Sequence, residues 1–290
     1  MSGILTRHVV LAGYVGFIFL LEIPTLFMSP STAGNYLSVS IFVMGFAAVV
    51  LHKTFHSGRF LDMGFRWNRN ALIGLAAGLL FLVVTVCFNY LLPWGLKWLD
   101  FERSEASPGL VEGVSPLVTG GIVFVLGTAI LFMPCIFGEE LAFRGYILPK
   151  MEEWLGPFKA VVVSSAVFGL WHLPAYFSVY SGGAAEEGWS SVLMMLLAHG
   201  ISVVPLCILY LTTRELYGVS LYHSAVDVVQ YCLVANPQLG EASELAMYKV
   251  DIINEPALTI AGSFWLIGAI PIMMALRKGA GRWTLPTARG

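Results

Sequence analysis

The stretch LVTGGIVFVLGTAILFMPCIFGEELAFR, residues 117–144, decides the fold class of this chain. Residues 117–137 carry no charge, and a run of about 20 apolar residues is long enough to cross a bilayer as an α-helix. Two acids, Glu139 and Glu140, follow directly, and the base Arg144 comes one helical turn later. Charged groups at bilayer depth cost roughly 2.5–3.5 kcal/mol each on insertion scales, and Arg144 can pair with one acid at most. The stretch therefore predicts a membrane helix whose charged end has a function.

The composition of the whole chain supports a membrane location. The 290 residues are 57% hydrophobic and 12% charged, whereas a soluble domain carries about 25% charged residues. The formal net charge of -2 argues against a nucleic-acid partner. No internal repeat or linker divides the sequence. These features predict an all-α polytopic transmembrane bundle that forms a single integral membrane domain, residues 1–290.

Apolar runs predict about eight membrane spans. They cover residues 8–28, 36–51, 71–92, 117–137, 158–179, 191–211, 219–234 and 257–276. With an inner amino terminus, the cytoplasmic segments hold twelve basic residues: Arg7, Lys53, Arg59, Arg66, Arg69, Lys150, Lys159, Arg214, Arg277, Lys278, Arg282 and Arg289. The outer side holds three, Lys97, Arg103 and Lys249. This positive-inside bias predicts that both termini are cytoplasmic.

The spacing of Glu140 and Arg144 predicts an ion pair. Residues four apart on a helix lie one turn apart on the same face. Glu139 is rotated by about 100° from Glu140 on an α-helix, so its side chain is expected to point elsewhere. The alternative is that the three charges simply mark the interfacial end of a helix.

Two later spans carry further polar residues. Phe168 lies one turn before His172, and on a helix it would cover the imidazole. His223 and Asp227 are four apart and share a helix face. The alternatives are a His172 that hydrogen-bonds a neighbouring helix, and a His223–Asp227 pair satisfied within its own helix.

Together Glu139, His172, His223 and Asp227 offer a general base, two imidazoles and a second acid from three helices. Such a set can activate water and stabilise an oxyanion. The same four residues can instead hold a divalent metal such as zinc. The HExxH signature of common zinc proteases is absent.

Other polar positions give weaker signals. Glu22 in the first span has no evident partner in sequence, and His199 is the only histidine of the sixth span, so a functional role is the less favoured interpretation for each. The four cysteines lack a CxxC spacing and are interpreted as packing residues: Cys87, Cys135, Cys207 and Cys232. Gly74 and Gly78 fit the small-xxx-small pattern of close helix packing, and an oligomer contact there is the less favoured reading.

The three polar segments resemble the motif series of the CPBP family, the type II CAAX prenyl proteases and bacteriocin-processing enzymes. That series reads EExxxR, FxxxH, then HxxxN or HxxxD. It is matched by residues 139–144, 168–172 and 223–227. The resemblance covers residues 117–234, less than half of the chain, and it depends on the order, spacing and membrane context of the motifs together.

The resemblance implies an intramembrane endopeptidase with an all-helical core. It implies that Glu139 and His172 activate the attacking water and that His223 and the residue at 227 polarise the scissile carbonyl. Glu140 and Arg144 would hold the site in shape. An ionised aspartate cannot donate a hydrogen bond to an oxyanion as an asparagine can. Asp227 therefore stays protonated, orients His223 through the other ring nitrogen, or belongs to a metal shell.

The sequence thus predicts hydrolysis of a peptide bond in a membrane-anchored protein or a hydrophobic peptide, within a bilayer and close to its cytoplasmic face. A prokaryotic plasma membrane is the expected location, and a prenylated CAAX tail is one substrate among several. The alternative from another class is a non-proteolytic scaffold or bacteriocin-immunity protein that retains the fold. An ion or proton-coupled transporter is less favoured because the chain lacks a repeated half.

Overall fold

The computed structural model describes residues 2–97, 99–103, 116–174, 189–230, 234–235 and 248–252. Its α-helices are α1 (Ser2–Glu22), α2 (Pro30–His56), α3 (Arg69–Val86), α4 (Leu92–Gly95), α5 (Pro116–Pro134), α6 (Leu148–Leu155), α7 (Pro157–Trp171), α10 (Trp189–Ser202), α11 (Val204–Thr213) and α12 (Tyr217–Val228). Short 3₁₀ helices follow α1 and α2, namely η1 (Ile23–Phe27) and η2 (Phe60–Met63). The π-helical segments with both ends in the described part of the chain are η3 (Cys87–Leu91), η4 (Cys135–Glu139) and η5 (Leu141–Ile147).

Four helices in the described part of the chain are long and apolar enough to cross a membrane. They cover Thr6–Phe27, Thr32–His56, Arg69–Gly95 and Val118–Leu155, and the apolar helices Pro157–Trp171 and His199–Thr213 are shorter. The helical membrane class is therefore confirmed. The second helix extends well beyond the predicted span 36–51, and the fourth continues without a break past the predicted end at residue 137.

The other predicted spans are only partly covered. Span 158–179 is helical to Trp171, and the predicted residues 175–179 lie outside the described part. The predicted span 191–211 consists of two helices that meet at Val203. Residues 231–233 of the seventh span and the whole eighth span, 257–276, also lie outside the described residues. The count of eight and the cytoplasmic termini remain predictions.

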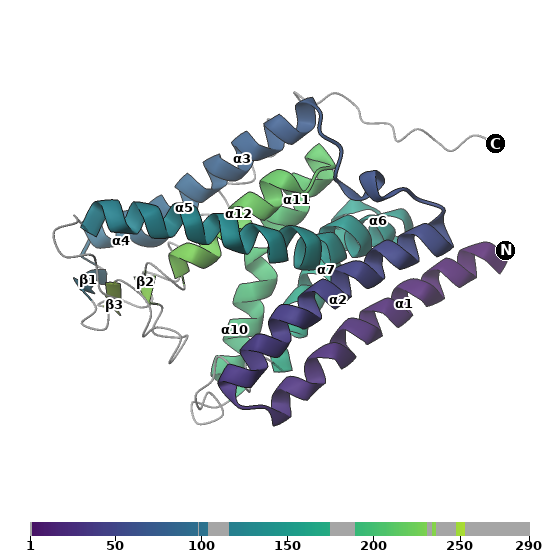
Figure 1. Cartoon of the computed structure of the whole chain (residues 1–290), viewed down its shortest axis with the longest axis horizontal. Helices are drawn as coiled ribbons and strands as arrows, with labels where there is room; N and C mark the ends of the chain where they lie inside the picture. The colour runs from purple at the N-terminus through teal and green to yellow at the C-terminus, as the bar shows by residue number, and fades with distance from the viewer. Residues whose placement is uncertain are drawn as a thin grey trace.

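The helices pack around a core that lies inside the bundle (Figure 1). Helices α1 and α2 lie side by side, α7 contacts both α6 and α10, and α12 packs against both α3 and α5. Tyr14, Met44, Phe81 and Phe143 are fully or almost fully buried in this core. Large apolar side chains such as that of Ile130 are exposed on the outside of the helices, as expected of a surface that contacts lipid.

Glycines bring α3 and α12 into very close contact. A Cβ at Gly78 would lie 2.3 Å from the carbonyl oxygen of Gly218, and a Cβ at Gly218 would lie 2.0 Å from that of Gly74. Small residues permit this approach between membrane helices. The small-xxx-small pattern is thus used within the chain, against the helix that carries His223 and Asp227.

A small sheet accompanies the bundle, and the prediction did not include it. Its strands are β1 (Leu99–Arg103), β2 (Val234–Ala235) and β3 (Tyr248–Ile252), in the order β1-β3-β2. Strand β1 pairs antiparallel with β3, and β2 pairs parallel with it. The sheet connects two segments that the sequence analysis assigned to outer loops.

Candidate active site

The charged residues of the first motif lie on π-helical turns within one long helix. Helix α5 ends at Pro134, and η4, η5 and α6 follow directly. Proline has no backbone N–H to continue the regular hydrogen-bond pattern, and π-turns inside α-helices occur frequently at functional sites. Glu139 ends η4, and Glu140 links it to η5. The α-helical geometry expected for these residues is therefore wrong in detail, although the helix itself is present.

Helix α2 supports the backbone immediately before Glu139. A Cβ at Gly138 would lie 2.0 Å from Cγ2 of Ile41, and a Cβ at Gly45 would lie 1.9 Å from the carbonyl oxygen of Phe137. Both glycines are needed for this close approach. The contact fixes the position from which the Glu139 side chain projects.

Glu140 and Arg144 form the ion pair that their spacing predicts. Nη1 of Arg144 lies 3.0 Å from Oε1 of Glu140, and the two side chains are 1% and 0% exposed. The guanidinium carbon lies 4.7 Å from the centroid of the Phe168 ring, a distance typical of a cation–π contact. The pair and the ring link the first motif to α7.

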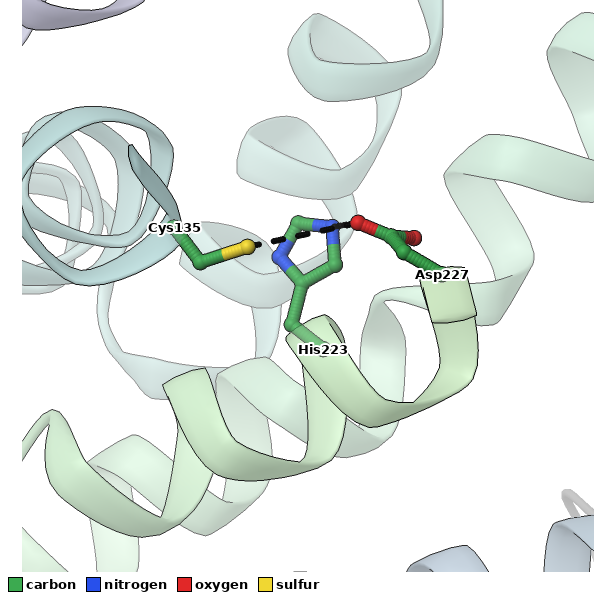
Figure 2. A group of neighbouring side chains, drawn as sticks. All are labelled: Cys135, His223 and Asp227. Carbon is green, nitrogen blue, oxygen red and sulfur yellow. Dashed lines mark hydrogen bonds and ion pairs between the residues drawn. The ribbon is translucent and has the colours of Figure 1, made fainter. Parts of the chain in front are cut away.

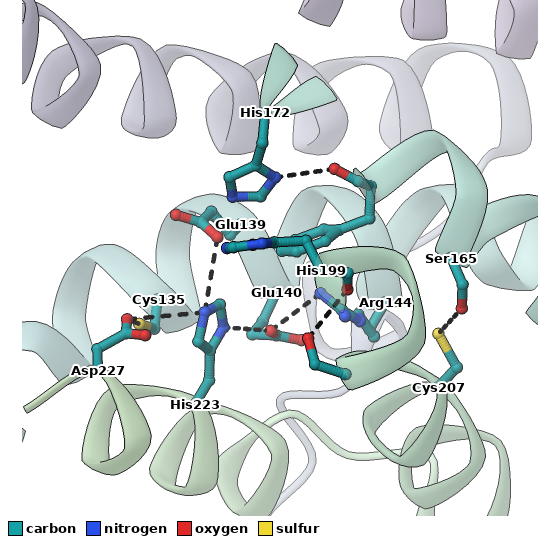
Figure 3. A network of polar contacts seen from close by, with 12 residues as sticks. Cys135, Glu139, Glu140, Arg144, Ser165, His172, His199, Cys207, His223 and Asp227 are labelled. Atoms are coloured by element: carbon teal, nitrogen blue, oxygen red, sulfur yellow. Dashed lines mark hydrogen bonds and ion pairs between the residues drawn. The ribbon is translucent and has the colours of Figure 1, made fainter. Parts of the chain in front are cut away.

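Glu140 also binds His223, which the sequence analysis did not predict. Nδ1 of His223 lies 2.6 Å from Oε1 of Glu140 (Figure 3). An ionised carboxylate accepts hydrogen bonds only, so Nδ1–H is the donor. The other nitrogen, Nε2, faces two further acids: Oε2 of Glu139 at 3.8 Å and Oδ2 of Asp227 at 3.7 Å. Those distances exceed a direct N–H···O hydrogen bond.

His172 lies directly after the last residue of α7. Its Nδ1 is 2.8 Å from the carbonyl oxygen of Phe168. A carbonyl accepts but does not donate, so Nδ1–H is the donor and Nε2 is the acceptor nitrogen. The Phe168 ring covers the imidazole at a centroid distance of 4.7 Å, as predicted. Figure 3 shows this imidazole beside the Glu139 carboxylate.

The predicted residues from three helices are thus found in one polar cluster. Glu139 comes from η4, His172 from the end of α7, and His223 and Asp227 from α12. In this arrangement Glu140 occupies Nδ1 of His223, and Asp227 lies nearer to Nε2.

Two members of the cluster were missed or undervalued. Sγ of Cys135, interpreted as a packing residue, lies 4.0 Å from Oδ2 of Asp227. Asp227 belongs to α12, 92 positions along the chain, so spacing along one helix did not indicate this contact. His199 of α10, which was judged a weak candidate, lies beside His172 with ring centroids 4.8 Å apart.

The residues with close ligand atoms differ from the metal set expected from sequence. Within the described residues, Cys135, His223 and Asp227 each offer an atom within 4.8 Å of the other two. Figure 2 shows their side chains directed toward one another. The expected set had Glu139 and His172 instead of the cysteine.

Two buried acids outside the cluster have structural partners. Glu22 accepts a hydrogen bond from Oγ of Ser40 at 3.0 Å. Glu215, in the linker between α11 and α12, accepts the backbone N–H of Gly218 at 3.1 Å and so caps the start of α12. Burial raises the pKa of Glu215 to about 7.

The fold and these contacts define an integral membrane protein whose helical bundle encloses carboxylates, imidazoles and a thiol. Residues 118–229 match the family model described as type II CAAX prenyl endopeptidase Rce1-like. The match covers less than half of the chain, and it confirms the resemblance predicted from the sequence. A search of curated proteins found no match. The family match indicates an intramembrane endopeptidase.

Proposed function

We propose that the chain hydrolyses a peptide bond of a membrane-anchored protein or a hydrophobic peptide, with Glu139 as the general base. The observation that carries this proposal is the arrangement around His223. The buried Arg144–Glu140 pair holds Nδ1 of that ring, so that Nε2 faces Glu139 and Asp227. An imidazole oriented in this way beside a carboxylate is suited to acyl-transfer chemistry.

Glu139 and His172 supply the base side of the reaction. The Glu139 side chain is 15% exposed, which leaves it accessible to a water molecule. His172 uses Nδ1–H on the Phe168 carbonyl, so its Nε2 can accept a proton from that water. Water between the two groups is thereby activated to attack the scissile carbonyl.

His223 and Asp227 stabilise the oxyanion that forms on the scissile carbonyl. Protonated at Nε2, His223 donates to the oxyanion as it develops. Asp227, 3.7 Å from that nitrogen, favours the protonated ring or shares a proton with it. The substrate segment enters from the bilayer, close to the cytoplasmic face of a prokaryotic plasma membrane. The bundle that receives it has eight spans, and both termini are cytoplasmic.

The test is cleavage by purified protein reconstituted in lipid nanodiscs, with a bacterial membrane proteome as substrate and new amino termini identified by mass spectrometry. We expect Glu139→Gln to reduce the rate by about 10²–10⁴-fold, because it removes the base and keeps the shape. Glu153→Gln is the matched control, since Glu153 is on the same long helix but half-exposed at its end.

Two results would contradict the proposal. Equal cleavage by Glu139→Gln and wild-type protein would remove the assigned base. The second result is the absence of cleavage by wild-type protein, together with full complementation of a deletion strain by the Glu139→Gln variant. It would favour the scaffold or immunity protein. A synthetic prenylated CAAX peptide added to the same assay tests whether a lipidated substrate is accepted.

A further inference from the structure

We propose that Cys135, His223 and Asp227 bind one zinc-like divalent transition metal. The three residues come from two elements that are far apart in sequence, η4 and α12, and their ligand atoms lie within 4.8 Å of one another. Figure 2 shows the thiol, the imidazole and the carboxylate converging on one region. The metal-binding claim is independent of proteolysis, whereas any catalytic role of the metal rests on the proposed function.

The distances fit a tetrahedral site after small side-chain movements. For zinc–ligand bonds of roughly 2.0–2.3 Å, a tetrahedron separates sulfur from oxygen by about 3.6 Å and nitrogen from oxygen by about 3.4 Å. The corresponding distances here are 4.0 Å from Sγ of Cys135 to Oδ2 of Asp227 and 3.7 Å from Nε2 of His223 to the same oxygen. The ligand atoms of Cys135 and His223 lie within 4.8 Å of each other, so all three separations shorten when one ion is bound.

Glu140 supplies the support that a histidine ligand requires. Metal-bound histidines usually donate their other N–H to a carboxylate or carbonyl, which fixes the ring and its tautomer. His223 donates Nδ1–H to Glu140 at 2.6 Å, and Arg144 holds Glu140 in turn. The arrangement leaves Nε2 outside that hydrogen bond and 3.7 Å from Oδ2 of Asp227.

The charges of the cluster also favour a cation. Three carboxylates, Glu139, Glu140 and Asp227, meet one guanidinium, that of Arg144. Once the Nε2 proton of His223 has left to make that nitrogen a ligand, two negative charges remain uncompensated in a largely buried site, which is costly. A divalent ion compensates these two charges; its binding also releases the thiol proton of Cys135 to solvent, and the thiolate leaves the occupied site with one net negative charge.

The ligand types select the class of metal. A thiolate and an imidazole suit zinc and its neighbours in the first transition series, whereas calcium and magnesium prefer oxygen ligands. Three protein ligands leave a fourth position for water. Glu139 approaches His223 within 3.8 Å, so its carboxylate is suited to accept a proton from such a water.

The first measurement is the metal content of the full chain. The protein is purified with a tag that contains no histidine, exposed to zinc, passed through desalting and analysed by plasma mass spectrometry. We expect about one equivalent of zinc per chain. Substitution by cobalt(II) should add an intense near-ultraviolet sulfur-to-cobalt charge-transfer band, which reports the Cys135 thiolate directly. Wild-type protein with neither zinc above background nor this band would overturn the proposal.

The variants assign the ligands. Cys135→Ser should abolish the charge-transfer band, whereas Cys207→Ser, which changes another buried cysteine, should keep it. Asp227→Asn should lower the zinc content while the band weakens or shifts. A band that persists in Cys135→Ser would place the metal elsewhere and refute the assignment.

A third variant separates this proposal from the proposed function. Glu139→Gln leaves all three ligands in place, so it should retain zinc and the cobalt band even though cleavage is lost. Metal binding without any cleavage by wild-type protein would refute the protease and keep the site. Cleavage by a preparation shown to be free of metal would limit the ion to a structural role.

Discussion

Replacement of Arg144 by methionine tests the central ion pair. The substitution keeps most of the length of the side chain and removes its charge. It leaves Glu140, which is 0% exposed, without the guanidinium at 3.0 Å. Removing one partner of a buried ion pair typically costs about 3–5 kcal/mol, because the remaining charge has no compensation. By the scaling for soluble proteins of 150–250 residues, that loss corresponds to a decrease in Tm of roughly 6–20 °C.

The chain offers a matched control. Arg214 binds Glu152 through two contacts of 2.6 and 2.8 Å, but these side chains are 30% and 20% exposed. Water therefore screens this pair, and Arg214→Met should cost about 1 kcal/mol. The difference between the two variants isolates the effect of burial.

The assay is thermal unfolding of the purified variants in one detergent, followed by intrinsic tryptophan fluorescence. The double variant Arg144→Met/Glu140→Gln should recover at least half of the lost stability, because it removes the orphaned charge and keeps an acceptor for His223. If Arg144→Met loses no more stability than Arg214→Met, the pair is not a major support of the site and the reasoning fails.

The remaining predictions concern residues that support the site from outside it. Burial raises the pKa of Glu215 from 4.5 to about 7, so ionisation of this side chain destabilises the folded state. The loss of folding free energy is absent below pH 4.5, grows between pH 4.5 and pH 7, and reaches roughly 3 kcal/mol above pH 7. Glu215→Gln should therefore be more stable than wild type at pH 8 and similar at pH 4.5, and equal Tm differences at both pH values would contradict this. Gly138→Ala should lower stability by about 1–3 kcal/mol and reduce activity, because its Cβ would lie 2.0 Å from Cγ2 of Ile41. Gly16→Ala, where no atom lies within 4 Å of the new Cβ, is the control, and equal effects of the two substitutions would exclude the close contact as the cause.

The sequence predicted the parts of the site that depend on local spacing. Glu140 and Arg144 pair one turn apart, and the Phe168 ring covers His172, as their intervals of four residues indicate. Such contacts need only a helical backbone, because residues four apart share a face. The apolar runs likewise predicted the membrane class, since transfer from water to lipid depends on composition and length.

The contacts between distant segments could not be predicted in the same way. The hydrogen bond from His223 to Glu140 joins residues 83 positions apart, and its existence depends on how α12 packs. That packing depends in turn on the close approach of Gly218 to Gly74, which the glycine pattern signalled without naming the partner helix. Cys135 was missed for the same reason, because its neighbour Asp227 belongs to α12.

The sequence contains local signals for the small sheet and for the irregular turn before Glu139, but the long apolar runs dominate the pattern. Residues 99–102 and 248–252 alternate apolar and polar side chains in sequence, which is typical of strands. Short strands between membrane helices are easily overlooked when apolar runs dominate the pattern. Pro134 marked the irregular turn before Glu139, but a proline indicates a disturbed helix without specifying a π-helical one.

His223 links the proposed chemistry and the proposed metal site through a single nitrogen. In both, Nδ1–H is held by Glu140, so the ring orientation is the same. At His223 the two states differ in the occupant of Nε2, which is a proton in the metal-free state and a metal ion in the other; metal binding also deprotonates Cys135. Either occupant is electrophilic and can stabilise an oxyanion. An ionised Asp227 cannot donate a hydrogen bond, whereas an asparagine can. In both states Asp227 instead serves as an anion beside the positive charge at Nε2. The aspartate is therefore compatible with hydrolysis by either route, and the thiol of Cys135 favours the metal.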